Sequence, residues 1–269
     1  MRAGTEKIIQ RLRAYALEGQ GKVEGWLQPS ALMVSWGILE AQVLHDIRGH
    51  VLEIGLYQGK FFFLLCASTR ADEKAIGVDP FQMRFRDGGV NDFRLRFDDN
   101  VARFASDVDL LIHQETSDRI QEHEFYHELG GLLRFISIDG SHLKADVLVD
   151  LATADHLLAE AGVIALDDFC SVYNPGVTEA LVEFLNQGTG NLRPFAICEN
   201  NLPVRGFGGS KLFICREGRE RFYLEEMKAR HPGAGDVVVD LCGHRTAVFS
   251  FGGEPFKKRL SRPPALDPG

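Results

Sequence analysis

Four side chains able to bind a metal ion or move a proton lie within one stretch, residues 135–169. Asp139 and His142 follow one apolar run, and Asp167 and Asp168 follow another. A carboxylate at the end of a buried strand is costly unless a partner compensates it. Mg²⁺ accepts aspartate oxygens as ligands, and histidine titrates where a general base must work. The three aspartates therefore indicate a metal site, with His142 as a base beside it.

These assignments leave alternatives open. One aspartate could cap a helix or pair with Arg134, although this explains a single aspartate better than all three. Lys144, two residues after His142, is a rival for the role of base. Asp167 and Asp168 are both candidates for direct ligation of the metal, and Asp168 is favoured.

A glycine-containing loop lies at the first expected turn from strand to helix, in the sequence VLEIGLYQGKF. Gly55 lets the chain turn and lets the backbone approach a ligand, while the following helix points its N–H groups at the same place. The dinucleotide fingerprint G-x-G-x-x-G is absent, because Tyr57 stands at its middle position and only Gly59 follows. Glu53 would repel a pyrophosphate and suits a ligand with a positive centre.

Two further residues follow later strands. Asp79 ends the second expected strand, twenty residues after Gly59, where a carboxylate commonly binds ribose hydroxyls. Ser117 follows the third strand, where it could meet a base edge or simply cap the next helix.

An alternation of apolar runs and helical segments predicts an α/β fold. The runs are apolar throughout, which is typical of parallel strands with helices on both faces of the sheet. The expected strands are 50–56, 74–81, 108–116, 132–139 and 163–169, then 192–200 and 210–216, which a short loop joins as an antiparallel pair. A C-terminal hairpin is expected within 236–251. The expected helices are 5–19, 31–44 with Ser30 as N-cap, 61–68, 91–105, 117–129, 146–161 with Gly162 as C-cap, 178–187 and 220–231.

Length and composition favour a single domain over residues 1–269. Its parts would be an N-terminal helical lid or cap (1–48), a cofactor-binding core (49–217) and a C-terminal extension (218–269). The net charge of −8 argues against a nucleic-acid partner. The five scattered cysteines form neither a zinc motif nor a disulfide framework, and no apolar run is long enough to span a membrane. We therefore expect a soluble, cytoplasmic protein.

The motifs together resemble the class I S-adenosylmethionine-dependent methyltransferases over about residues 45–217. The loop E-I-G-L-Y-Q-G is similar to that of the catechol O-methyltransferase type, which also has Tyr in place of the middle glycine. The runs I-D-G-S-H and G-V-I-A-L-D-D resemble the metal-dependent O-methyltransferases, most closely the macrocin-type sugar enzymes of antibiotic biosynthesis. The resemblance implies a Rossmann-like, doubly wound, mostly parallel seven-stranded sheet with an antiparallel last strand.

The resemblance also implies a role for each motif residue. Asp139 would serve both the cofactor and Mg²⁺, together with Asp167 and Asp168 on the metal. His142 stands where the catechol enzymes have a lysine, which keeps Lys144 in contention as the base. The other implied contacts with S-adenosylmethionine are Glu53, Gly55, Tyr57 and Gly59 at the methionine end, Asp79 at the ribose and Ser117 at the adenine.

The sequence thus predicts an S-adenosylmethionine- and Mg²⁺-dependent O-methyltransferase acting on a small-molecule hydroxyl, such as a sugar or a natural-product diol. The region from Trp26 to Trp36 and the loop 201–209 are expected to shape the acceptor pocket. Arg205 in this loop could meet an acidic acceptor, but a solvated arginine is favoured. The C-terminal hairpin offers an edge for a homo-oligomer. The alternatives are an NAD-dependent oxidoreductase, a non-catalytic nucleotide-binding protein, and a metal-free methyltransferase whose acids bind an amine.

Overall fold

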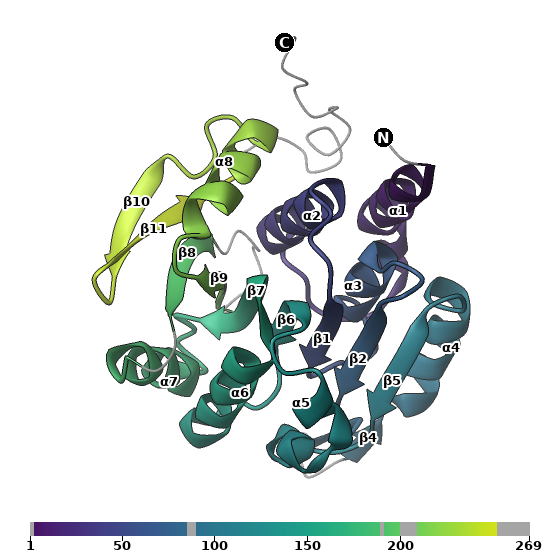
Figure 1. Cartoon of the computed structure of the whole chain (residues 1–269). Helices are drawn as coiled ribbons and strands as arrows, with labels where there is room; N and C mark the ends of the chain where they lie inside the picture. Colours follow the sequence, from purple (N-terminus) through teal and green to yellow (C-terminus); the bar gives the residue numbers. More distant parts are fainter. Residues whose placement is uncertain (1–2, 85–89, 189–190, 200–208, 252–269) are drawn as a thin grey trace.

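The computed structural model describes residues 3–84, 90–188, 191–199 and 209–251, and it shows one central sheet with helices on both faces (Figure 1). Among the described residues the sheet has nine strands in the order β10-β11-β8-β9-β7-β6-β1-β2-β5. Their bounds are β1 His50–Ile54, β2 Lys74–Val78, β5 Asp109–His113, β6 Leu133–Ile138, β7 Leu158–Phe169, β8 Leu192–Cys198, β9 Ser210–Arg216, β10 Val237–Leu241 and β11 His244–Phe249.

The strand directions confirm a mostly parallel sheet. Strands β5, β2, β1, β6 and β7 are parallel, whereas β9 runs antiparallel to both of its neighbours, β7 and β8. The expected count of seven strands is wrong, because the C-terminal hairpin joins the same sheet. Its strand β11 pairs in parallel with β8, and β10 pairs with β11. A separate small hairpin, β3 (Gln82–Arg84) with β4 (Val90–Asp92), was not expected.

Two apolar layers hold the helices against the sheet. Strand residues alternate between them: in β6, Phe135 belongs to the layer under α1–α4 and α8, and Ile136 to the layer under α5–α7. None of the helices within the described ranges is long and apolar enough to cross a membrane. The helices are α1 Ala3–Ala14, α2 Pro29–Leu44, α3 Phe62–Ser68, α4 Arg94–Phe104, α5 Glu124–Glu128, α6 Lys144–Leu157, α7 Pro175–Asn186 and α8 Glu220–Arg230.

Three expected local features are wrong. Helix α6 ends at Leu157 and β7 begins at once, so Gly162 lies inside a strand and caps nothing. A Cβ at Gly162 would lie 2.8 Å from the carbonyl oxygen of Leu133, so the glycine lets β6 and β7 lie close together. Ser30 is not an N-cap, because α2 starts at Pro29 and the Ser30 hydroxyl donates to the Glu199 carbonyl at 2.6 Å. The expected helix 117–129 is a 3₁₀ turn followed by the short α5.

Arg134 at the start of β6 is fully buried and lies at the amino edge of the sheet. It pairs with Glu73 at 3.2 Å and donates hydrogen bonds to Gln42 and Ser68. It is therefore not the partner of Asp139, which follows the other end of the same strand.

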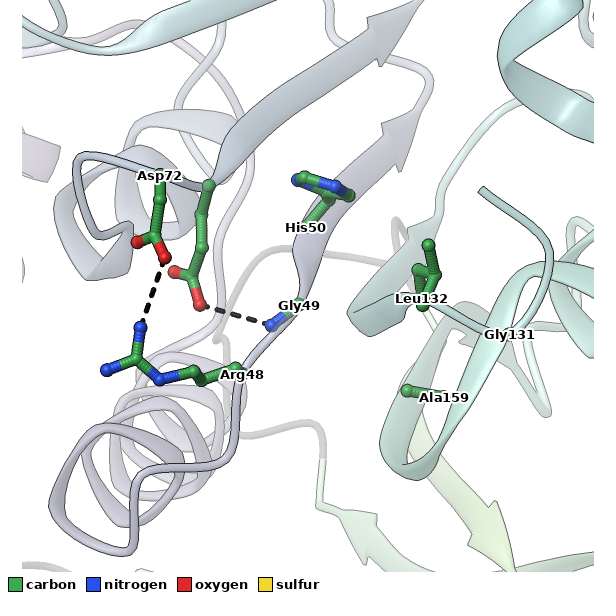
Figure 2. A pocket seen from close by; sticks show the side chains of 8 residues that line it. Arg48, Gly49, His50, Asp72, Gly131, Leu132 and Ala159 are labelled. Atoms are coloured by element: carbon green, nitrogen blue, oxygen red, sulfur yellow. Dashed lines mark hydrogen bonds and ion pairs between the residues drawn. The ribbon is translucent and has the colours of Figure 1, made fainter. Parts of the chain in front are cut away.

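A pocket of about 270 Å³ lies at this same amino edge (Figure 2). In it Arg48 pairs with Asp72 at 3.1 Å, and the backbone N–H of Gly49 donates to Glu73. Its lining residues precede or begin β1, β2, β6 and β7, so the pocket is on the opposite edge from the aspartates. In an open α/β sheet the ligand-binding crevice is at the carboxyl ends of the strands, so this pocket is not the candidate site.

We predict that Arg134→Ala lowers the free energy of unfolding by about 3–5 kcal/mol, because it leaves the buried carboxylate of Glu73 with less compensating charge. Denaturant unfolding measures the change. Arg221→Ala is the control, since Arg221 is exposed and pairs with Glu225 on the surface, and it should unfold like the wild type. Equal stability of the two variants would contradict the role assigned to Arg134.

Candidate active site

The residues expected to act together do meet at the carboxyl edge of the sheet. Strand β1 lies between β2 and β6, so the chain leaves β1 toward one side and later returns to the other. Such a reversal opens a crevice beyond the strand ends, where α/β proteins bind ligands. Glu53 and Gly55 at β1, Asp79 after β2 and Asp139 after β6 all lie around this crevice.

Gly55 is required by the close approach of two loops. Its φ is +87°, and an added Cβ would lie 1.9 Å from the carbonyl oxygen of Asp139. The loops after β1 and β6 are joined there by a 2.8 Å hydrogen bond from the Asp139 N–H to the Ile54 carbonyl. Gly59 also has positive φ, but the group that approaches it closely is the Phe63 ring. Gly55 thus fixes the crevice, and Gly59 fixes the packing of the following helix.

Asp79 orders the glycine loop through its carboxylate. One oxygen accepts the N–H groups of Leu56 at 2.6 Å and Tyr57 at 2.8 Å, and the other accepts that of Phe81. Burial raises the pKa of Asp79, and these backbone hydrogen bonds oppose that rise. A carboxylate has about four acceptor sites, so Asp79 retains capacity for a ribose hydroxyl.

Glu53 presents an unsatisfied acceptor near the carboxyl end of β1. Its side chain is 1% exposed, and its Oε2 has no hydrogen-bond partner among the described residues. The Ser137 hydroxyl lies 3.4 Å from Oε1. Burial raises the pKa of Glu53 well above its usual range, and Lys211 opposes this. Buried acceptors are rarely left unpaired, so this oxygen fits the ammonium group at the methionine end of S-adenosylmethionine.

The N-terminal segment contacts the glycine loop. The ring centroids of Trp26 and Tyr57 are 5.4 Å apart, and those of Tyr57 and Phe93 are 4.4 Å apart. Glu24 accepts hydrogen bonds from the Tyr57 hydroxyl and from Gln58. These contacts place aromatic side chains beside the loop expected to hold the cofactor.

His142 and Asp168 form a hydrogen-bonded pair. The distance from His142 Nε2 to Asp168 Oδ2 is 2.8 Å, and this bond raises the pKa of His142. Burial acts to raise the pKa of Asp168, but hydrogen bonds from His142, the Gly209 N–H and Asn174 outweigh burial and lower it. The imidazole is 45% exposed, so an acceptor molecule can reach it.

The convergent set of possible metal ligands differs from the expected one. Ligand atoms of Asp139, His142 and Asp168 lie within 4.8 Å of one another. Asp167 instead pairs with Lys211, and its second oxygen accepts the N–H of Asp168. Two carboxylates and an imidazole are a suitable donor set for a divalent cation. The residues therefore fit such an ion, with Asp139 and Asp168 as its oxygen ligands, while the Asp167 oxygens have Lys211 and the Asp168 N–H as partners.

Lys211 is the site residue that sequence reasoning missed. Its side chain is 2% exposed, with Nζ 3.1 Å from Asp167 and 4.3 Å above the Phe61 ring. Burial acts to lower its pKa, but the carboxylates of Asp167, Asp139 and Glu53 outweigh burial and raise it. The ammonium therefore neutralises part of the acidic cluster. The available signal was a lysine near the start of the otherwise apolar strand SKLFICR.

The remaining expected residues that the structure describes have partners other than His142 and Asp168. Lys144 begins α6 and forms an exposed ion pair with Glu183 on α7 at 2.6 Å. Ser117 begins the 3₁₀ turn, whose N-cap is Thr116, and its hydroxyl opposes the burial that raises the pKa of Asp150 to about 6. Arg205 and the other expected pocket residues 201–208 lie outside the described residues.

Comparisons with known proteins give a domain match and a similar fold. Residues 52–169 match the family model described as a methyltransferase domain. The cofactor-bound structure of Rv0187 from MTB shares the fold, with 16% identity, a TM-score of 0.50, and 79% of this chain and 90% of that chain covered. No curated protein sequence matches the chain.

Two further solved structures are similar at lower TM-scores. CalS11, a TDP-rhamnose 3'-O-methyltransferase of calicheamicin biosynthesis, has 16% identity and a TM-score of 0.48, covering 81% of this chain and 88% of its own. TomG, an O-methyltransferase from Streptomyces achromogenes in complex with SAM, has 14% identity and a TM-score of 0.49. The match covers 81% of this chain and 91% of the TomG chain.

We predict that Lys211→Met lowers the free energy of unfolding by about 3–5 kcal/mol, because the buried carboxylates lose their internal cation. Adding Asp167→Asn should recover part of this loss, since it removes one uncompensated charge. Denaturant unfolding of both variants tests this. Lys74→Met is the control, because Lys74 forms an exposed pair with Asp109 at the amino edge. A double variant no more stable than Lys211→Met would contradict the charge balance.

Proposed function

We propose that this chain is a class I S-adenosylmethionine-dependent methyltransferase that transfers the methyl group to a hydroxyl oxygen of a small molecule with the help of a divalent cation, Mg²⁺. The observation that carries the proposal is the pair of His142 and Asp168 at 2.8 Å, with Asp139 beside it at the crevice. A partly exposed histidine oriented by a carboxylate can remove a proton from an acceptor hydroxyl.

The cofactor's charged end would lie against Glu53. The unpaired Glu53 oxygen would accept the ammonium group, and the bare backbone at Gly55 gives the methionine part access to the loop. Asp79 would bind the ribose hydroxyls with its remaining acceptor sites, and Ser117 would lie near the adenine. This order follows the crevice from β1 across β2 to the turn after β5.

The reaction needs little more than an oriented oxygen nucleophile, because the sulfonium methyl group is already activated. The neutral His142 ring donates its Nε2–H to the Asp168 carboxylate, so the lone pair on Nδ1 would accept the proton of the acceptor hydroxyl. The resulting imidazolium is stabilised by the same carboxylate. A cation held by Asp139 and Asp168 would hold the acceptor oxygens and lower the pKa of the hydroxyl. Alignment of the acceptor oxygen, the methyl carbon and the cofactor sulfur would supply the rest of the rate acceleration.

The acceptor we propose is a sugar or a natural-product diol, on the strength of the sequence resemblance to the macrocin-type enzymes. Leu143 and Val172 are exposed and close in sequence to His142 and Asp168, so they are candidates for apolar contacts with the acceptor. An NAD-dependent oxidoreductase is set aside by the match to the methyltransferase domain.

Calorimetry and a chelation assay test this function. We expect S-adenosylmethionine to bind and NAD not to bind. With a panel of sugar and phenolic diols, formation of S-adenosylhomocysteine should stop in EDTA and return with Mg²⁺, while cofactor binding persists in EDTA. Failure of the cofactor to bind would overturn the proposed function. Turnover that survives thorough chelation would remove only the metal from it.

His142→Ala should lower kcat by about 10²- to 10⁴-fold, the range for loss of a general base, whereas Lys144→Ala should leave it nearly unchanged. Only the neutral imidazole accepts a proton, and the pKa of His142 is raised. The rate should therefore rise with pH and level off above the ordinary histidine value of about 6.5.

The Asp168→Asn variant tests the cause of this pKa shift without relying on turnover. Loss of the charged partner should move the His142 titration to lower pH, as followed by NMR in metal-free buffer. An unchanged titration would mean that Asp168 does not set the charge of His142. Loss of turnover in Lys144→Ala, with retention in His142→Ala, would assign the base to Lys144.

A further inference from the structure

A second group of metal-ligating side chains lies at the end of β5, apart from the acidic cluster. His113 is the last residue of this strand, Glu115 follows it, and His123 immediately precedes α5. One ligand atom from each lies within 4.8 Å of the other two. In the sheet, β2 and β1 separate β5 from β6, whose end carries Asp139. The two groups are therefore distinct sites on one sheet edge.

The three ligand atoms have a spacing that one small cation can bridge. The distance from His113 Nδ1 to Glu115 Oε1 is 3.6 Å, and His123 Nε2 contacts the same Glu115 oxygen. Tetrahedral zinc with bonds of about 2.0 Å separates its ligands by about 3.3 Å. Insertion of the ion between the three groups therefore needs only a small outward shift of the His123 ring.

Packing holds both imidazole rings in place. The His113 and His123 ring centroids are 4.2 Å apart, and the Phe125 ring lies 5.0 Å from the first and 5.8 Å from the second. The side chains of His113 and Glu115 are 18% exposed and that of His123 is 30% exposed. The group is thus ordered by its neighbours and still open to water and to an ion on one side.

We propose that His113, Glu115 and His123 bind a divalent transition-metal ion such as Zn²⁺. Two imidazoles and one carboxylate suit Zn²⁺, Co²⁺ or Ni²⁺, with water completing the shell. The acidic cluster has one imidazole and two carboxylates, which favours harder ions. The two sites should therefore differ in which metal they prefer.

The position of the site gives the ion a structural role. Glu115 and His123 flank the 3₁₀ turn Ser117–Glu122, which begins with the expected adenine contact. The His113 carbonyl accepts the N–H of Asp79, the expected ribose ligand, at 3.1 Å. An ion joining His113, Glu115 and His123 would tie both ends of this turn to β5. This consequence for cofactor affinity rests on the proposed function, whereas the metal site itself does not.

The experiment titrates Co²⁺ and Zn²⁺ into the full chain, by visible absorption and by calorimetry. Variants Glu115→Gln and His123→Ala remove one ligand each, and circular dichroism checks that they fold. His142→Ala alters the acidic cluster and leaves the three proposed ligands in place. His45→Ala is the matched control, because His45 is an exposed histidine that pairs with Glu226.

We expect wild type, His45→Ala and His142→Ala each to bind one equivalent of Zn²⁺ at the proposed site. Glu115→Gln and His123→Ala should bind this equivalent at least about tenfold more weakly. Cobalt should give visible d–d bands that disappear in the same two variants. Equal Zn²⁺ binding by wild type and His123→Ala would overturn the proposal, as would loss of Zn²⁺ binding only in His142→Ala. In those cases the Glu115–His123 contact is a hydrogen bond and nothing more.

If the metal binds as proposed, S-adenosylmethionine should bind several-fold more weakly to His123→Ala than to wild type in Zn²⁺. The affinities should converge in EDTA, because both proteins then lack the ion. An unchanged cofactor affinity alongside lost Zn²⁺ binding would reject the role in ordering the turn and leave the metal site standing. No binding of the cofactor to any variant would instead point to failure of the proposed function.

Discussion

The crowding of buried carboxylates at one sheet edge is the constraint on which this structure depends. Glu53 is inaccessible to water, Asp139 is partly buried, and the charge of Asp167 acts on both of them. Burial and mutual repulsion both favour the protonated acids, and burial is the main reason that the pKa of Asp139 is raised well above its usual range. The ammonium of Lys211 is the fixed compensation, and a cofactor ammonium or a divalent cation adds to it. The site is thus built to receive positive charge.

The sequence was sufficient to predict the parts of this site that depend on parallel strands. Apolar runs with acids at their ends place Asp79, Asp139 and Asp168 at a single edge whatever the details of packing. Gly55 could be assigned for a similar reason, because a turn that tight tolerates no side chain. The backbone confirms this, since a Cβ there would collide with the carbonyl of Asp139.

Features that depend on which strands are neighbours in the sheet could not be predicted from the sequence. Lys211 belongs to the cluster only because β9 is antiparallel, which brings its first residues to the edge where β7 ends. The sequence of the C-terminal hairpin does not indicate which strand it pairs with, so the predicted sheet had seven strands instead of nine. The run LLAEAG fits a helix end or a strand start equally well, and contacts with β6 decide for the strand.

Asp167 and Asp168 divide two tasks between them. Both carboxylates raise the pKa of Asp139, yet each has a different partner. Asp167 lies opposite the start of β9 and meets Lys211, beside the Phe61 ring of the α3 layer. Asp168 has φ +56°, at a register irregularity in the pairing with β9, and meets His142. One carboxylate is therefore used to balance a buried charge, and its neighbour is left to orient the base.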